Sequence, residues 1–462
     1  MNKLYAENIL IGSQWQSNKT LSISKSGEIL AIEEGKTPSA TILDGPVIPG
    51  MVNCHSHAFQ RAFAGYSEYR GRSKSGAYVE DSFWSWRDIM YQFVGKMSPQ
   101  DAHTVARFVY MEMLQAGYTS VAEFHYLHHQ ASGQQYDDPA EMSHQIINAA
   151  SQTGISLTHL PVLYSYAGFG DMKPSQAQGR FIHSTDEYLK LIEALSDQYS
   201  DSANFKLGIA PHSLRAVNQQ QLNEVTQHIR KIDKHSPIHI HIAEQMQEVN
   251  DCLQHHGQRP VEWLLDNFLM DCNWCLIHAT HLTGSERCNL AKSSAVTGIC
   301  PTTEANLGDG IFPAAEFLRQ GGQVAIGSDS HISINVAEEI RLLEYAQRLT
   351  KHQRAVLVGE QCASVGQFLY SETCINGASA ISQNVGKIAV GKRADLLVLD
   401  EQNPSLFSKK EHAILDAAIF SCAQLPVKDV FVAGRQVLHS GRHDHQSEII
   451  ENYRAVLTKL TR

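Results

Sequence analysis

The chain has 462 residues, of which 43% are hydrophobic, 8% aromatic and 19% charged, an ordinary balance for a globular protein with a large core. This length predicts one large domain with a smaller one beside it. The formal net charge is −10 and no run of lysine or arginine occurs, which argues against a nucleic-acid partner, because phosphate contacts need a clustered basic face.

The nine cysteines are scattered along the chain, which is typical of reduced thiols in a cytoplasmic protein. We interpret the CxxC pair Cys272 and Cys275 as packing residues, because the surrounding NWCLIHATHL predicts a buried strand. The N-terminal residues lack the pattern of a secretion signal, and no window is apolar over the ~18 residues that a membrane span needs. We therefore expect a cytoplasmic protein with no membrane partner.

Residues 1–46 alternate like short antiparallel strands with a turn at Ser26-Gly27. From Val47 the pattern changes to apolar runs, each followed by a helical pattern. The eight runs are VIPGMVNCHSH, YTSVAEFHY, ISLTHLPVLY, FKLGIAPHS, PIHIHIAEQ, NWCLIHATHL, AVTGICPTTE and QVAIGSDSH. A helix after the first run has Ser98 as its predicted cap, Pro99 at its first position and Gly117 as its stop.

Apolar strands that alternate with helices indicate a parallel sheet covered on both faces. Eight such units fit a closed (β/α)₈ TIM barrel better than an open sheet. After the barrel the chain returns to short strands with glycine turns, as in KIAVGKRADLLVLD. We predict an α/β protein in which residues 50–387 form the barrel, and residues 1–49 and 388–462 together form a small β-sandwich domain.

Polar residues cluster at the ends of these strands, where barrel active sites form. His55 and His57 stand two apart on the first strand, so both imidazoles face the same side. A catalytic zinc site needs about three protein ligands and an open position. His55, His57, His241 and Asp329 supply such a set, and we choose His241 over His239 because His239 lies one barrel layer deeper.

Three residues are candidates for the chemistry. Asp329 suits both metal ligation and acceptance of the water's proton, and Glu244, just past the fifth strand, can carry that proton to a departing nitrogen. His278 can orient the water and stabilise a tetrahedral intermediate. Any single strand-end histidine is more often structural, but five titratable groups at one rim favour a site that activates water on a metal ion.

The motifs GMVNCHSHAFQR, HIHIAEQ and SDSH, together with His278 and the late GKRADLLVLD, resemble the amidohydrolase superfamily across nearly the whole chain. Members with two metals carry a carboxylated lysine at the end of strand four. This chain has APHS there, and the nearby Lys206 stands at the start of that strand. The resemblance therefore implies one zinc ion per chain.

Within the superfamily, HSHAFQRAFAG, FWSWRDIMY, EFHYLHH, APHSLRAV and HIHIAEQMQEV resemble deiminases of histidine degradation that hydrolyse N-formimino-L-glutamate to N-formyl-L-glutamate and ammonia. Such a small dicarboxylate needs cations or strong donors. The resemblance implies binding residues in the loops after the strands, with Arg87 and Arg215 also compatible with surface ion pairs. The implied residues are Gln60, Arg87, Tyr126, His212 and Arg215. We also expect a homodimer.

Two other functions remain open. An aminohydrolase acting on a purine, pyrimidine or triazine ring would use the same zinc chemistry in a neutral, aromatic pocket without arginines. A non-catalytic scaffold would have lost its metal, which the intact ligand set and Glu244 argue against. The long segment 65–95 is either a lid over the pocket or a contact with a neighbouring subunit.

Overall fold

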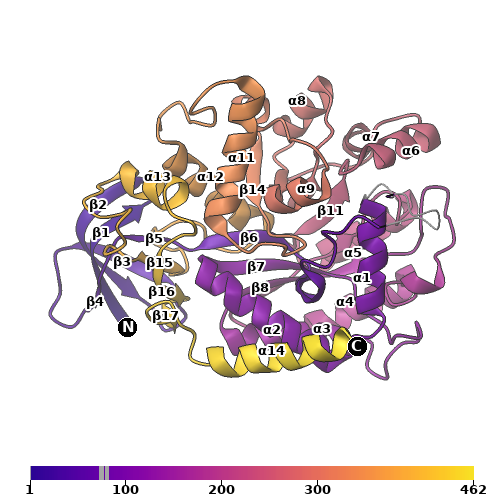
Figure 1. Ribbon diagram of the computed structural model, residues 1–462, viewed down its shortest axis with the longest axis horizontal. Coiled ribbons are helices and arrows are strands. Elements are labelled where there is room, and N and C mark those ends of the chain that lie inside the picture. Colours follow the sequence, from indigo (N-terminus) through magenta and orange to yellow (C-terminus); the bar gives the residue numbers. More distant parts are fainter. Residues whose placement is uncertain (1, 72–77, 79–82) are drawn as a thin grey trace.

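The computed structural model describes residues 2–71, 78 and 83–462. Parallel strands pair in two groups whose neighbouring edges meet, so that the strands surround a common centre (Figure 1). Backbone bridges from Ser56 to Asp329 and from Ile209 to Ile238 join the two groups. The strands are β6 (Met51–Ser56), β7 (Tyr118–His125), β8 (Ser156–Leu163), β9 (Phe205–Leu207) with β10 (Ala210–Pro211), β11 (Ile238–Ile242), β12 (Trp274–His278), β13 (Val296–Ile299) and β14 (Gln323–Ile326).

Strands β7, β8, β11 and β12 are buried along their whole length because helices cover the outside of the sheet. The predicted TIM-barrel fold class is confirmed. The predicted helix after the first strand is also confirmed. It is capped by Ser98, begins with Pro99 and ends where Gly117 adopts a φ of 99°.

The barrel helices and 3₁₀ turns follow the strands in chain order. They are η1 (Ala58–Phe63), α1 (Phe83–Val94), α2 (Pro99–Ala116), α3 (Glu141–Thr153), η2 (Gln176–Gln178), α4 (Thr185–Tyr199), α5 (Gln219–Ile232), α6 (Met246–His256), α7 (Pro260–Asn267), α8 (Gly284–Lys292), α9 (Pro301–Leu307), α10 (Ala314–Arg319), α11 (Val336–Lys351) and α12 (Val365–Ala380).

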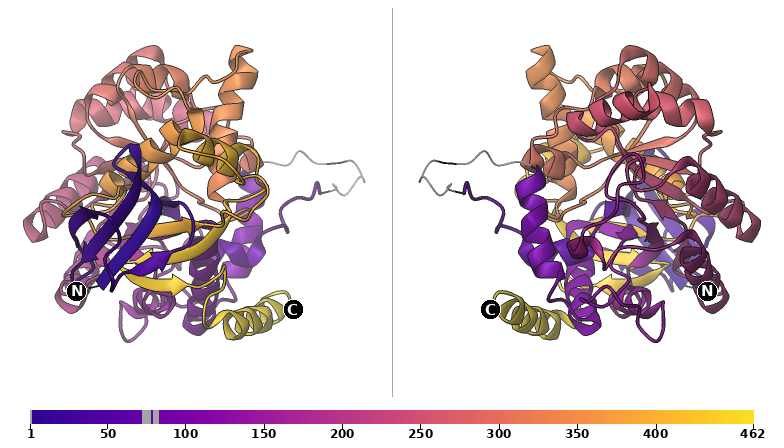
Figure 2. Two further views of the ribbon diagram at one scale, coloured as in Figure 1. Left: turned by 90° about the vertical axis from the view of Figure 1, so that its left-hand side faces the viewer. Right: turned by 90° about the vertical axis from the view of Figure 1, so that its right-hand side faces the viewer.

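Both chain ends contribute to a second, mixed sheet beside the barrel (Figure 2). In it, β15 from the C-terminal part pairs antiparallel with β5 from the N-terminal part. Apolar residues of both ends share one small core. The strands are β1 (Asn2–Ile11), β2 (Gln14–Ile23), β3 (Ile29–Glu34), β4 (Thr41–Leu43), β5 (Val47–Pro49), β15 (Leu396–Leu399), β16 (Val427–Val432) and β17 (Arg435–Leu438).

The C-terminal part also contains two helices, α13 (His412–Phe420) and α14 (Gln446–Leu460). Helix α14 lies along α2 of the barrel, and the rings of Phe108 and Tyr453 stack with centroids 3.8 Å apart (Figure 1). The division into residues 1–49 with 388–462 and residues 50–387 stays a prediction.

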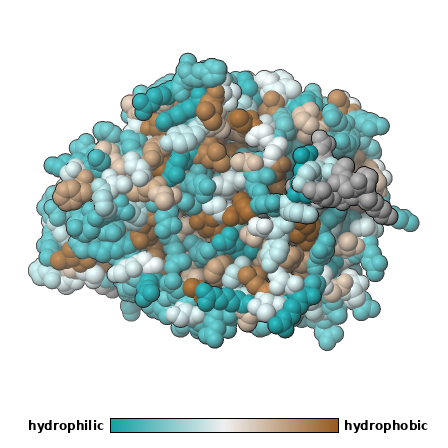
Figure 3. Space-filling view, viewed as in Figure 1, coloured by the Kyte–Doolittle hydropathy of each residue, from teal (hydrophilic) through white to brown (hydrophobic). Residues whose placement is uncertain are grey.

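The surface shown in Figure 3 mixes hydrophilic and hydrophobic residues. Within the described ranges, no helix combines the length and apolar character needed to cross a membrane.

Candidate active site

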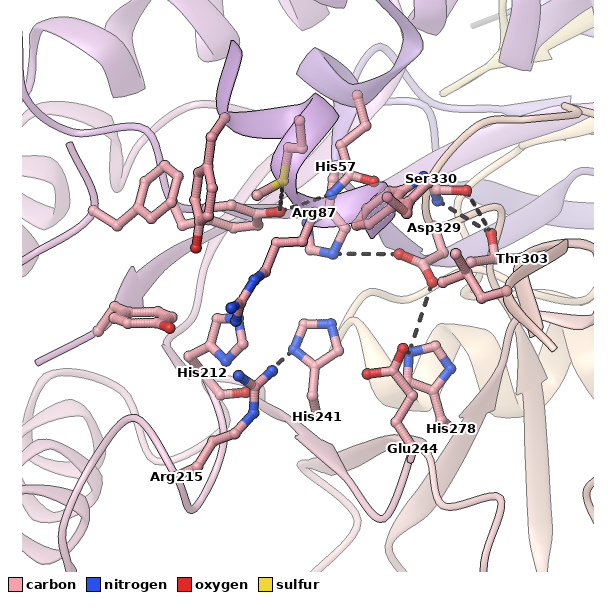
Figure 4. A pocket seen from close by; sticks show the side chains of 18 residues that line it. His57, Arg87, His212, Arg215, His241, Glu244, His278, Thr303, Asp329 and Ser330 are labelled. Carbon is pink, nitrogen blue, oxygen red and sulfur yellow. Dashed lines mark hydrogen bonds and ion pairs between the residues drawn. The ribbon is translucent and has the colours of Figure 1, made fainter. Parts of the chain in front are cut away.

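Four predicted metal ligands meet at the carboxyl ends of the barrel strands. Figure 4 shows His57, His241 and Asp329 of this set. His55 lies on β6 and His57 directly after it, His241 lies on β11, and Asp329 follows β14. Their ligand-capable atoms all lie within 4.8 Å of one another, and none of the four residues is more than 7% exposed. Asp329 Oδ1 lies 3.5 Å from His55 Nε2 and 3.3 Å from His57 Nε2.

The hydrogen bonds around these imidazoles fit a metal ion. His57 Nδ1 lies 2.8 Å from the carbonyl oxygen of Phe124, and His241 Nδ1 lies 3.2 Å from that of His212. A carbonyl oxygen only accepts, so each Nδ1 carries the proton and each Nε2 presents a lone pair. Burial and the neighbouring His57 lower the pKa of His55 to about 3, which keeps this imidazole neutral. Neutral imidazoles and a carboxylate are ligands for a divalent metal ion.

His239 and Lys206 lie outside this cluster. His239 Nε2 lies 2.8 Å from the carbonyl oxygen of Ala380, at the deeper layer that its position on the strand predicts. Lys206 on β9 forms an ion pair with Asp233. Neither residue is among the side chains that line the pocket.

Glu244 and His278 lie beside the ligand cluster. His278 Nε2 is 3.6 Å from Asp329 Oδ2 and 4.0 Å from Glu244 Oε1. His278 Nδ1 is 3.1 Å from Glu304 Oε1. Since Glu304 Oε1 also accepts from the Cys300 amide at 2.8 Å, the carboxylate fixes the orientation of the His278 ring.

Two of these residues adopt a backbone conformation that side chains other than glycine rarely take. His278 has a φ of 68° and Asp329 a φ of 46°. Such strain is concentrated at functional sites, where surrounding hydrogen bonds hold it in place. Here the Asp329 amide donates to the His55 carbonyl at 3.0 Å, and its carbonyl accepts from the His57 amide at 3.1 Å.

Burial and the charges of the site shift the pKa values of the acid–base groups in opposite directions. Burial alone would raise the pKa of Asp329, but a hydrogen bond from His55 and the charge of His278 hold it well below its usual value. Burial raises the pKa of Glu244 although His278 opposes this. Burial would lower the pKa of His278, whereas Glu244, Glu304 and Asp329 raise it well above its usual value. A protonated His278 and an ionised Asp329 thus lie side by side.

All five residues predicted to bind substrate line the same pocket as His57, His241 and Asp329 of the ligand cluster. Gln60 Nε2 donates to the Tyr126 hydroxyl at 2.7 Å. Figure 4 shows the guanidinium groups of Arg87 and Arg215 directed into the pocket on the side of His212 and His241. Arg215 is partly buried and has no ion-pair partner among the described residues.

Arg87 lies on helix α1, whereas the sequence predicted a loop at this position. The expectation was wrong because the long segment 65–95 was interpreted as one continuous loop, whereas Phe83–Val94 form a helix. Within segment 65–95, residues 72–77 and 79–82 lie outside the described residues, so its role as a lid or a subunit contact stays open.

Sequence reasoning missed several residues that shape the site. Glu248 accepts from the amides of Ala243 and Glu244 at 3.1 and 3.2 Å and so holds the turn that presents Glu244. Glu123 accepts from the Ser56 hydroxyl at 2.5 Å and the Ala58 amide at 2.7 Å, on either side of His57. The further pocket-lining residues are Trp86, Met90, Tyr91, Tyr164, Phe181, Thr303, Leu307 and Ser330. A carboxylate within a buried strand, as at Glu123, was the one signal available.

A sequence model described as the amidohydrolase family matches residues 47–437. The chain is 46% identical over 461 residues to formimidoylglutamate deiminase of Pseudomonas aeruginosa, and the match covers 100% of both chains. The crystal structure of an amidohydrolase from Brucella melitensis has a TM-score of 0.92 at 40% identity, with 100% of both chains covered. An adenosine deaminase from Xanthomonas campestris with bound zinc has a TM-score of 0.81 at 21% identity, covering 99% and 98%, which shows the fold alone.

Proposed function

Because this chain belongs to the amidohydrolase family, we propose that it is a zinc-dependent deiminase that hydrolyses N-formimino-L-glutamate to N-formyl-L-glutamate and ammonia. The observation that carries the proposal is that two arginines line the same pocket as three members of the His–His–His–Asp cluster, His57, His241 and Asp329. The arginines match a dicarboxylate, and the cluster matches hydrolysis at a carbon–nitrogen bond. The relative from Pseudomonas aeruginosa has the corresponding name.

His55, His57, His241 and Asp329 would hold the metal ion. Zinc is the metal we propose, since three imidazoles and one carboxylate are ligands typical of its catalytic sites. When bound, the metal supplies Lewis acidity and lowers the pKa of water toward neutrality.

Three side chains accept or donate the protons and hydrogen bonds that the reaction needs. In the reaction, water adds to the formimino carbon, the carbon–nitrogen bond breaks, and the nitrogen leaves as ammonia. Asp329, which is ionised beside His278, accepts a proton from the attacking water. Glu244, whose pKa is raised by burial, delivers a proton to the departing nitrogen. His278, held by Glu304, donates a hydrogen bond to the oxygen as negative charge develops there.

The part of the pocket that lies away from Glu244 and His278 binds the two carboxylates of the substrate. Arg87 and Arg215 provide charge-assisted donors, and His212, Gln60 and Tyr126 add polar contacts. A ring aminohydrolase would need a neutral aromatic surface at this place. The pocket does contain Tyr91, Tyr164 and Phe181, but the two arginines beside them favour an anionic substrate over a neutral ring.

The substrate assignment is tested by ammonia release from a panel of compounds. We expect N-formimino-L-glutamate to be the best substrate. N-formimino-L-aspartate, one methylene shorter, should be poorer, and a formimino amine without carboxylates nearly inert. Faster deamination of cytosine or an aminopurine would contradict the assignment and support a ring aminohydrolase instead.

Replacing Arg215 by methionine should lower kcat/KM for N-formimino-L-glutamate about ten- to a hundred-fold, because each charge-assisted hydrogen bond to a carboxylate contributes about 1.5–3 kcal/mol. Arg87→Met should act in the same direction. Metal content should stay unchanged, since neither arginine belongs to the ligand cluster. Steady-state kinetics with elemental analysis of the same samples measures both effects. An unchanged kcat/KM in both variants would show that the carboxylates bind elsewhere.

A further inference from the structure

Helix α1 forms one wall of the pocket. Its residues Trp86, Arg87, Met90 and Tyr91 all line the cavity, as expected for one face of a helix. Near the start of the helix, Trp86 packs on Phe63 of η1 with ring centroids 5.5 Å apart. The placement of α1 therefore decides where the Arg87 guanidinium stands relative to the ligand cluster.

The far end of α1 is held by Arg180, a residue of a different loop, and Arg180 is only 3% exposed. Arg180 Nη1 donates to the carbonyl groups of Val94 and of Met97, the latter at 2.9 Å. Its Nε donates to the His129 carbonyl at 2.8 Å. The Arg180 carbonyl in turn accepts from the amides of His128 and His129 at 3.0 and 3.1 Å. One residue thus ties the end of α1 to the loop that follows β7.

Carbonyl acceptors satisfy Nη1 and Nε of this buried guanidinium. Within the described ranges, Arg180 forms no ion pair with a carboxylate. Carbonyl groups at the end of a helix lack partners inside the helix and carry partial negative charge, so they are favourable acceptors for a cation. The planar guanidinium reaches acceptors on separate segments at once, which a lysine ammonium on its flexible stem does poorly.

The next residue extends the contact to the pocket itself. Phe181 lines the cavity, and its ring lies 6.0 Å from that of Tyr91 on α1 and 5.1 Å from that of Tyr126. Arg180 is not among the residues that line the pocket. It is therefore placed to act on the substrate site through α1 and not by contact.

We propose that Arg180 is a positioning residue for substrate recognition: by binding the C-terminal end of α1, it sets the place of the Arg87 guanidinium in the carboxylate-binding part of the pocket. This inference rests on the proposed function for the identity of the substrate. Its structural part, the anchoring of α1, can be tested without any substrate.

The kinetic test compares Arg180→Met and Arg180→Lys with the parent on N-formimino-L-glutamate. We expect kcat/KM of Arg180→Met to fall about ten- to a hundred-fold, mainly through a higher KM, because small misplacements of binding groups are costly. Arg180→Lys should recover part of the loss, and metal content should not change. A fall in kcat with an unchanged KM would contradict a role in carboxylate recognition.

Arg341→Met is the matched control. Arg341 donates to the carbonyls of Ile419 at 2.9 Å and Cys422 at 2.6 Å, at the end of α13 and away from the pocket. It therefore resembles Arg180 as an arginine that caps a helix end. We expect Arg341→Met to lower thermal stability without changing KM. A similar rise of KM in this control would show that the effect of Arg180 is general destabilisation.

A double-mutant cycle separates action through Arg87 from an independent effect. If Arg180 acts through Arg87, then Arg180→Met should raise KM much less in an Arg87→Met background than in the parent. Equal fold-changes in both backgrounds would overturn the proposal.

Hydrogen exchange supplies the readout that needs no substrate. Amides of residues 88–97 should exchange at least about tenfold faster in Arg180→Met, while those of α5 keep their parental rates, because only the local opening of α1 becomes easier. Unchanged exchange in residues 88–97 would refute the anchoring. Faster exchange in a protein that does not act on N-formimino-L-glutamate would instead keep the anchoring and refute the proposed function.

Discussion

Glu244→Gln should lose most of the turnover on N-formimino-L-glutamate, with kcat reduced about 10²- to 10⁴-fold, the usual contribution of a general acid–base group. Glutamine keeps the size of the side chain but cannot deliver a proton to the departing nitrogen. The fold and metal content should be retained, because Glu244 is not in the ligand cluster and its amide is still held by Glu248. Single-turnover ammonia release, combined with elemental analysis, measures the loss.

Glu286→Gln provides a control for the loss of a buried carboxylate. Glu286 is buried and pairs with Arg259 at 2.8 Å, outside the pocket. This variant should keep its kcat per folded molecule even where its thermal stability falls. A Glu244→Gln protein that turns over at nearly the parental rate would show that another group carries the proton.

The barrel was predictable because its strands are long apolar runs whose order along the chain is also their order in space. Two of these runs are divided in the structure in a way that their apolar pattern does not indicate. The first run divides at Gly50 into β5 of the terminal sheet and β6 of the barrel. The fourth run divides into β9 and β10 at Gly208, where an added Cβ would lie 2.5 Å from the Pro237 carbonyl oxygen. Close backbone approaches of this kind leave little signal in hydrophobic periodicity.

The ligand cluster was predictable for the same topological reason. In a parallel barrel the carboxyl ends of all strands open to one face, so polar residues such as His55, His241 and Asp329 converge there. His239 and His241 are two residues apart and share one face of the strand, so the choice between them followed from depth alone.

Contacts made by helices and loops were not predictable in this way. Glu304 orients His278 from the first turn of α9, and Arg180 holds α1 from a loop that is remote in sequence. Their positions depend on how connections of different lengths fold over the barrel, which no periodic pattern records. Glu304 and Arg180 lie outside the sequence motifs of the site, so their contacts are visible only in the folded structure.

His241→Ala should bind little or no metal, whereas His239→Ala should retain about one metal ion per folded chain, because the proposed single site uses His241 and not His239. The two histidines lie on the same strand, two residues apart, and both are buried. Only His241 places its Nε2 in the cluster, 3.0 Å from His55 Nε2, while His239 is bound to the Ala380 carbonyl. Loss of His239 removes a buried hydrogen bond and lowers stability, but it leaves His55, His57, His241 and Asp329 in place. Elemental analysis after gel filtration, with competition against a chelator, measures metal retention without reference to activity. Full metal content in His241→Ala together with loss in His239→Ala would reassign the ligand, and about two metal ions in the parent would contradict the mononuclear site.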